Sequence, residues 1–447
     1  MLGKQRIKQI TDGILARSAA DQTEVVILSG DSFLTRFANS TIHQNVAETN
    51  TEVRIRVVLG KRVGVAATNN LEDAALAQAL ENALAISRLQ PENPDFKSLP
   101  GPLPLAEVSA FSEATAKCTP EQRAKGAGSI CLMARGDGVV ASGALTTEVA
   151  ELAVANSLGT FAYHIATVAD INTVVMSDTS AGYAAARALS VDDLDFEAIG
   201  REAIQKCLLS QNPRPLEPGE YTVILEPYAV QDFIQMMGYT GFGAVAMQEG
   251  RSFMVSKIGQ QVVDPRVSIW DDGLSPDGLP VPFDFEGVPK QRVDLIEKGI
   301  ARGVVYDSYR AGKENKPSTG HALPAPNAFG PMPLNPFFGP GDATLDEMIA
   351  GTQRGLYVTR FHYTRPVDPK RVIITGMTRD GTFLIENGEI AYPVKNLRFT
   401  QSYLEALNYV EAIGRRPRLL GGMASIGGAS VPALKLGKFR FTGATEF

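Results

Sequence analysis

The side chains that could hold a catalytic metal ion are few in this chain and lie far apart. The four histidines are followed by Gln, Ile, Ala and Tyr rather than by Glu: His43, His164, His321 and His362. The closest two are about forty residues apart, so no pair shares a helix turn as in an HExxH zinc site. A zinc peptidase needs converging ligands, an open position for water and a base beside it. The pattern favours a chain without its own metal site and leaves open a site assembled from distant segments.

Four carboxylates occur close together in the second half of the chain: Asp271, Asp272, Asp284 and Glu286. Paired carboxylates can act as a general acid and a general base. These, however, follow short β-rich runs, in turns where an Asp side chain accepts hydrogen bonds from nearby backbone N–H groups. We interpret them as turn residues rather than as a catalytic pair.

A glycine-rich stretch contains Gly238, Gly241 and Gly243, with Gly250 shortly after it. It lacks the GxxxxGK[ST] pattern of a phosphate-binding loop. The following Ser252 has neither a GxSxG context nor a neighbouring histidine, so it is not a predicted nucleophile. We interpret the glycines as positions where another part of the backbone comes close.

Composition limits the class of protein further. A chain of 447 residues is too long for one ordinary core, so two or three domains are expected. The net charge of -6 and the pI near 5.5 argue against a basic nucleic-acid surface. Three widely spaced cysteines form no disulfide framework and suit a reducing cytoplasm. No signal peptide is visible, and no apolar run of about eighteen residues could cross a membrane.

The first part of the chain, residues 1–95, reads as an N-terminal α+β domain. Apolar residues at helical spacing predict a helix over residues 5–18, and 24–28 reads as a strand. Residues 53–67 run through a Gly-Lys turn at 60–61 and predict a hairpin. A second helix is expected to begin with Asn70 as its cap.

A Pro-rich connector leads to a middle domain of mixed structure, residues 105–212. Thr119 and Gln122 form a capping-box pattern at the start of one helix. Two β-rich runs meet at residues 157–159, which read as a hairpin turn. A second helix, 190–209, is expected to have Ser190 as its cap.

The last and longest part, residues 216–447, reads as a β-rich domain of barrel or sandwich type. Its runs of β-branched residues are short and are separated by frequent Gly and Pro. Separate strands are expected at, among others, 303–306, 371–375 and 381–385. Asn387-Gly388 is the strongest short hairpin signal in the chain.

Residues 311–341 are dense in Pro and Gly and lack periodicity. A long loop without structure of its own in a compact domain is usually either functional or disordered. Phe329, Phe337 and Phe338 are candidates for contact with substrate or a partner. We expect that replacing Phe337 and Phe338 by Ser weakens such contacts and leaves the thermal melt of the isolated chain almost unchanged. A disordered surface insertion is the alternative.

Short segments spread over nearly the whole chain resemble the TldD/PmbA family and occur in that family's order. They are residues 35–39 (TRFAN), 42–44 (IHQ), 54–57 (RIRV), 60–64 (GKRVG), 218–227 (PGEYTVILEP), 249–253 (EGRSF), 257–259 (KIG), 271–273 (DDG), 283–288 (FDFEGV) and 384–390 (LIENGEI). The resemblance implies a metallopeptidase-type C-terminal domain.

The chain departs from the catalytic branch of that family at its metal site. In that branch an HExxxH helix supplies two zinc ligands and a general base, and a cysteine near the C-terminus supplies another ligand. The matching stretch here reads GYTGFG, with Gly238 and Gly243 at the ligand positions. Ala424 corresponds to the cysteine, and no cysteine follows Cys207. The resemblance is therefore to the non-catalytic branch, usually called TldE or PmbA.

This resemblance implies the non-metal subunit of a cytoplasmic peptidase that degrades or processes unfolded peptides. A TldD-type partner would bring the zinc, no cofactor would bind this chain, and the chain alone would be inactive. The alternative is a stand-alone homodimer that binds peptide or regulates without catalysis. An independent metallopeptidase would need ligands that the sequence does not offer. Neither a nucleic acid nor a membrane is an expected partner.

Overall fold

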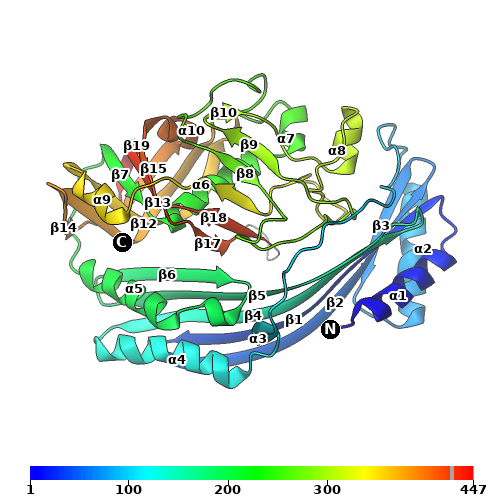
Figure 1. The fold of residues 1–447 in the computed structure, drawn as a ribbon, viewed down its shortest axis with the longest axis horizontal. Coiled ribbons are helices and arrows are strands. Elements are labelled where there is room, and N and C mark those ends of the chain that lie inside the picture. The colour runs from blue at the N-terminus through cyan, green and yellow to red at the C-terminus, as the bar shows by residue number, and fades with distance from the viewer. Residues whose placement is uncertain (423–426, 446–447) are drawn as a thin grey trace.

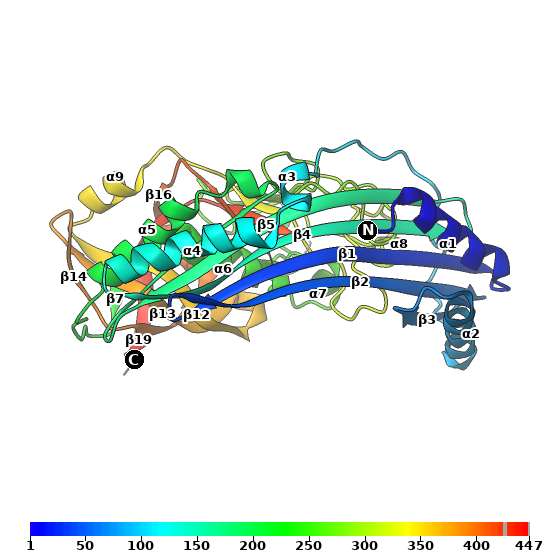
Figure 2. The same cartoon turned by 90° about the horizontal axis from the view of Figure 1, so that it is seen from below.

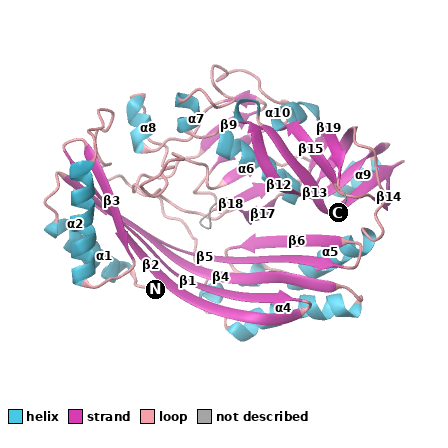
Figure 3. Cartoon of the chain, turned by 180° about the vertical axis from the view of Figure 1, so that it is seen from behind, coloured by secondary structure: helices cyan, strands magenta, loops and turns pink. Residues whose placement is uncertain are grey.

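The computed structural model describes residues 1–422 and 427–445. A long curved sheet forms one layer, and a β-rich C-terminal part lies against its concave side, as Figures 1 and 3 show from opposite sides. The predicted α+β fold with a barrel- or sandwich-like C-terminal domain is confirmed. In the described ranges, no helix is both long and apolar enough to span a bilayer.

The long sheet has six antiparallel strands in the order β3–β2–β1–β4–β5–β6. Their bounds are β1 Gln22–Ala38, β2 Thr41–Leu59, β3 Arg62–Thr68, β4 Val140–Asn156, β5 Phe161–Met176 and β6 Ala181–Ala188. Strand β1 pairs with β2 on one side and with β4 on the other. The ranges 1–95 and 105–212 therefore build one sheet together, and the division of the chain into three domains stays a prediction.

Strand β1 packs against helices with one face and against the C-terminal part with the other. Val25 and Ile27 pack against helices α1 (Lys4–Arg17) and α2 (Asp73–Leu89). Val26, between them, points to the other face and packs against the C-terminal part. This alternation follows from the two-residue period of a strand. The predicted first helix and the predicted hairpin of β2 and β3 are confirmed.

The other half of the sheet is covered by helices α4 (Pro120–Gly136) and α5 (Phe196–Leu209), which Figure 2 shows lying along the strands. The predicted capping box is present. The Thr119 hydroxyl accepts a bond from the Gln122 N–H, and the Gln122 side chain accepts one from the Thr119 N–H. A short helix, α3 (Glu113–Ala116), precedes α4.

Two predicted helix starts are wrong by a few residues. Asn70 accepts a bond from the Glu72 N–H, and α2 begins only after that turn. Ser190 caps a short 3-10 turn, whereas α5 is capped by Asp195. In both cases the Asn or Ser side chain bonds the backbone two residues on, which makes a local turn that precedes the helix.

The C-terminal part contains a closed barrel. Its strands run in the order β12–β7–β19–β15–β13, and a further pairing of β13 with β12 closes the ring. The bounds are β7 Glu220–Leu225, β12 Arg354–Asp368, β13 Ile373–Glu386, β15 Leu397–Ser402 and β19 Leu434–Ala444. The predicted turn Asn387-Gly388, with φ of 53° and 82°, leads from β13 to β14 (Glu389–Pro393).

A smaller sheet in the order β10–β9–β8–β11–β18–β17 lies beside the barrel. Its strands are β8 Ile269–Asp271, β9 Val293–Glu297, β10 Ile300–Ala301, β11 Pro336–Phe338, β17 Arg418–Gly421 and β18 Gly428–Val431, and β16 Val410–Ile413 pairs with β19. The helices of this part are α6 Pro227–Thr240, α7 Ala244–Gln248, α8 Ser308–Lys313, α9 Leu345–Ala350 and α10 Tyr403–Ala406.

Some predicted strands of the C-terminal part differ from the observed ones. The two predicted at 371–375 and 381–385 are one strand, β13. It stays continuous because Asp380 and Gly381 adopt φ of 56° and 119° opposite a single residue of β12, which is a bulge. Residues 303–306 form only an isolated bridge, between Val305 and Gly243.

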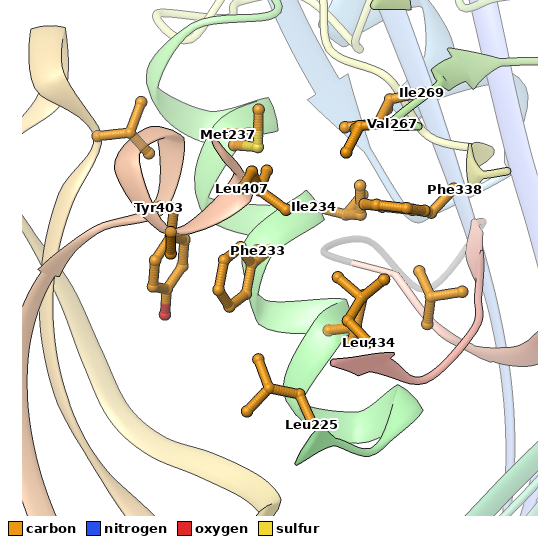
Figure 4. Packing of buried hydrophobic residues seen from close by; sticks show 14 of the residues in the cluster. Leu225, Phe233, Ile234, Met237, Val267, Ile269, Phe338, Tyr403, Leu407 and Leu434 are labelled. Atoms are coloured by element: carbon orange, nitrogen blue, oxygen red, sulfur yellow. The ribbon is translucent and has the colours of Figure 1, made fainter. Parts of the chain in front are cut away.

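Helix α6 packs into the barrel core, and its side chains meet those of several strands in one large cluster (Figure 4). Phe233 stacks on Tyr403 with ring centroids 3.8 Å apart. Phe338 of β11 belongs to the same cluster as Ile234. The core therefore fixes the position of α6, and with it the position of the residues at the end of that helix.

Candidate functional site

A pocket of about 230 Å³ lies at the C-terminal end of α6. Gly238, Gly243 and Phe329, three of the residues singled out in the sequence, line it together. The remaining lining comes from Tyr239, Thr240, Ala246, Arg251, Pro331, Met332, Pro366 and Pro369. The structure thus brings the GYTGFG stretch and the Pro/Gly segment to one place.

The stretch from Gly238 to Gly243 spans a break between two helices. Helix α6 ends at Thr240, and α7 begins at Ala244 with Gly243 as its N-cap. The two glycines therefore do not lie on one continuous helix. Side chains at these positions would not share a helix face in the way that an HExxxH pattern requires.

Gly243 lies directly beneath the backbone of the Pro/Gly segment. A Cβ atom built on Gly243 would come within 2.5 Å of the Pro331 carbonyl oxygen. At Gly238 the nearest atom is Pro333 Cγ, at 3.4 Å from such a Cβ, which is ordinary contact. The interpretation that these glycines allow close approach of another backbone is confirmed at Gly243. Gly241 instead faces a side chain, the ring of Phe253.

Two exposed aromatic rings form the rim of the pocket. Tyr239 is 45% exposed and Phe329 is 63% exposed. Their ring centroids are 6.2 Å apart, at an interplanar angle of 52°. Because Phe329 is held against another side chain at the mouth of a cavity, it is well placed to contact an apolar group entering the pocket.

The described lining of the pocket does not fit a zinc ion. It contains no His, Cys, Asp or Glu, and Arg251 pairs outward with Glu249. Zinc takes thiolate, imidazole and carboxylate ligands. Elsewhere in residues 1–422 and 427–445, no group of three such side chains is arranged to hold a metal. That this chain binds no metal stays a prediction, and Ala424 lies outside the described residues.

Phe337 and Phe338 lie in the core rather than at the pocket. Phe337 stacks on Trp270 with ring centroids 5.6 Å apart. Phe338 is 1% exposed and belongs to the large hydrophobic cluster around α6. Their replacement would cost about 3–5 kcal/mol each. The expectation that the isolated chain would melt almost unchanged is therefore wrong, because β11 is a buried strand of the smaller sheet.

The four clustered carboxylates divide into two pairs. Asp272 and Asp284 accept bonds from backbone N–H groups two to four residues away, as predicted. Asp284 also accepts a bond from the distant Ala322 N–H, and Asp271 and Glu286 bind partners far away in the sequence. Asp271 bonds His321, and Glu286 pairs with Arg56 of the long sheet. No local pattern signals these two roles.

A larger cavity, of about 820 Å³, lies beside α5 and the start of α6. Its wall carries a buried charge network. Lys206 Nζ donates to Glu202 Oε1 at 2.7 Å and to Glu226 Oε2 at 2.6 Å, and the Tyr357 hydroxyl donates to Glu226. Burial raises the pKa of Glu226, and Lys206 opposes this shift. The network satisfies its own members, so we interpret it as structural.

The chain is similar in sequence and in fold to known proteins. Three family models match the chain: PmbA/TldA metallopeptidase domain 1 at residues 23–87, its central domain at 99–210 and its C-terminal domain at 218–443. Metalloprotease PmbA of Escherichia coli O157:H7 is 26% identical over 424 residues, which cover 90% of this chain and 89% of that protein.

Other relatives align over a shorter range. A metalloprotease of Methanothermobacter thermautotrophicus is 28% identical over 53% of this chain and 52% of its own length. The chain spans about half the length of several such relatives. In fold, it matches TldE from Thermococcus kodakarensis with a TM-score of 0.88 at 20% identity, covering 98% of this chain and 99% of that one. The chain therefore belongs to the TldD/PmbA family of metallopeptidase-type proteins and has a TldE-like fold.

Proposed function

We propose that this chain is the non-metal-binding subunit of a TldD/TldE-type peptidase complex that acts on unfolded peptides. The observation that carries the proposal is the contact at Gly243, where the Pro331 carbonyl occupies the space that a ligand side chain would need. Because the backbone of Pro331 fills this space, a histidine or carboxylate side chain at position 243 would not fit without movement of the backbone. Zinc and the activation of water belong, in this proposal, to a TldD-type partner.

The contribution of this chain is contact with the peptide. Ligand pockets usually measure about 300–1,000 Å³. The pocket at the end of α6 measures about 230 Å³, so it suits one side chain of a peptide rather than a whole small molecule. Tyr239, Phe329 and the surrounding prolines offer an apolar surface to such a side chain. The chain would therefore position an extended peptide that the partner cleaves.

We place the complex in the cytoplasm and expect no nucleic acid or membrane as partner. Cys118, Cys131 and Cys207 are free thiols, and all three are buried. Burial raises the pKa of each thiol, which keeps them protonated and unreactive. Unpaired cysteines suit a reducing compartment, and the net charge of -6 disfavours polyanions.

Co-expression with an HExxxH-containing paralogue from the same source tests the proposal. The two chains are expected to elute as one peak in size-exclusion chromatography, and peptide cleavage is expected only from that peak. Two separate peaks over a range of salt and protein concentrations would contradict the proposal. A homodimer of this chain that binds peptide but no paralogue would support the stand-alone alternative.

A further inference from the structure

A cluster of buried polar side chains lies beneath the segment that covers the pocket. We call residues 321–335 the pocket loop. Asp271, Asp284, Lys290, His321 and Asn335 all lie at or near its two ends, and each of them is at most 5% exposed. Burying this many polar groups destabilises the fold unless each group has a hydrogen-bond partner. We therefore expect a partner for every polar atom of the cluster.

One carboxylate of the cluster holds both ends of the pocket loop. Asp271 Oδ1 lies 2.8 Å from His321 Nε2, at the first residue of the loop. Asp271 Oδ2 accepts a bond from the Asn335 N–H at 2.7 Å, at the last residue. Asp284 adds a third attachment, because its Oδ2 accepts from the Ala322 N–H at 2.8 Å.

Two atoms of the cluster have no hydrogen-bond partner among the described residues. They are Lys290 Nζ and Asn335 Oδ1. The orientation of the Asn335 amide is settled by its other end, because Nδ2 donates to the Leu279 carbonyl at 2.9 Å. Oδ1 is therefore an acceptor without a donor, and Lys290 is a donor without an acceptor. A buried polar atom that stays unsatisfied destabilises the fold, and a charged group does so more strongly.

Both residues line the same small cavity, which measures about 10 Å³ and also touches Asp284. This is close to the smallest volume that holds one water molecule, which needs two to four polar partners. The Lys290 nitrogen in the cavity wall disfavours a metal cation, and the Asp284 carboxyl group in the same wall disfavours an anion. A neutral molecule that both donates and accepts meets all these conditions.

We propose that this cavity binds one ordered water molecule, which accepts a hydrogen bond from Lys290 Nζ and donates to Asn335 Oδ1 and Asp284. The water completes the attachment of the pocket loop that Asp271 begins. The water thus links Lys290 Nζ to the Asp284 carboxyl group, two groups that form no direct ion pair. Lys290 and Asn335 are thus positioning residues for the loop, and this holds whether or not the proposed function is correct.

The consequence reaches the pocket itself. The pocket loop carries Phe329 to Tyr239 and places the Pro331 carbonyl above Gly243. Its middle is also tied to the long sheet, because Arg54 Nη1 donates to the Ala325 carbonyl at 2.7 Å. A loop that is released at its ends would move the rim ring and open the space above Gly243.

A crystal structure of the intact chain at high resolution tests the proposal directly. The expected result is a single density peak about 2.7–3.2 Å from both Lys290 Nζ and Asn335 Oδ1. A Lys290 ammonium in direct contact with Asp271, Asp284 or Asn335, with no density between them, would overturn it. This measurement needs no variant and so does not depend on the folding of one.

Hydrogen exchange tests the role in the loop. Lys290→Met removes the donor to the water and so loosens the end of the pocket loop, where the Asn335 backbone N–H bonds the Asp271 carboxylate. Exchange of this backbone amide is expected to become at least about tenfold faster. Lys257→Met, at an exposed lysine of the same part of the chain, serves as the control and is expected to change nothing. If both variants exchange at the wild-type rate at Asn335, the loop does not depend on Lys290.

Discussion

The two ends of helix α6 differ in what their side chains do. The first half is buried in the barrel, where Phe233 stacks on Tyr403 and Asp232 binds the hydroxyls of Tyr403 and Thr364. The other end carries Gly238 and the half-exposed Tyr239 at a pocket without carboxylate, imidazole or thiol in its described lining. In α6, the carboxyl group that could do acid–base chemistry, Asp232, bonds to residues of the barrel. The accessible end of the helix offers no such group to a ligand in the pocket.

The largest expected effect separates the two ends by stability. Phe233→Ala removes a fully buried ring from the barrel core and is expected to lower the free energy of unfolding by about 3–5 kcal/mol. Tyr239→Ala, at the other end of the same helix, is expected to cost less than about 1 kcal/mol because its ring is 45% exposed. Equal losses in denaturant titrations of the two variants would break the comparison.

The second prediction concerns Asp232, the partly buried carboxyl group of α6. Burial raises the pKa of Asp232 to about 6, and the bonds from Thr364 and Tyr403 oppose this shift. A raised pKa means that the folded chain holds the proton more tightly than the unfolded chain. The resulting stabilisation is complete below about pH 4 and is lost as the pH rises through about 6.

Asp232→Asn removes this titration. Between pH 3 and pH 8, the wild-type chain is expected to lose about 3 kcal/mol of stability relative to the variant. Denaturant midpoints measured across this range give the difference, and Asp277→Asn, at an exposed position, serves as the control. A difference that stays constant with pH, or that grows in favour of the wild type, would contradict the assignment.

The smallest stability effect concerns the two glycines. Gly243→Ala forces a Cβ to within 2.5 Å of the Pro331 carbonyl and is expected to cost about 1–3 kcal/mol, as overpacking does. Gly238→Ala meets nothing closer than 3.4 Å and gains helix propensity, so it is expected to be neutral or mildly stabilising. Thermal melts of the two variants compare them, and a destabilised Gly238→Ala with an unaffected Gly243→Ala would reverse the account.

Local features of the fold were predictable from the sequence. The capping box at Thr119 and the turn at Asn387-Gly388 depend only on residues within a few positions of each other, and both are confirmed. The pairing of β1 with β4 and the closure of the barrel join strands that are distant in the sequence. No local pattern records such pairings, which is why the first two predicted ranges did not reveal their shared sheet.

The candidate site was predictable only in part, for the same reason. Family resemblance pointed to Gly238 and Gly243, and the Pro/Gly composition pointed to the segment with Phe329. Composition alone, however, did not separate this exposed ring from Phe337 and Phe338, whose burial depends on strands β8 and β18 on either side of β11. The pairing of Asp271 with His321, 50 residues apart, was equally invisible.

The zinc content of the purified chain tests the central claim most directly. Elemental analysis of the isolated chain, next to its peptide-cleaving activity with and without a chelator, measures whether the pocket end of α6 takes part in metal chemistry. The account predicts no stoichiometric zinc and no cleavage by the chain alone. One zinc per chain together with chelator-sensitive cleavage would contradict it.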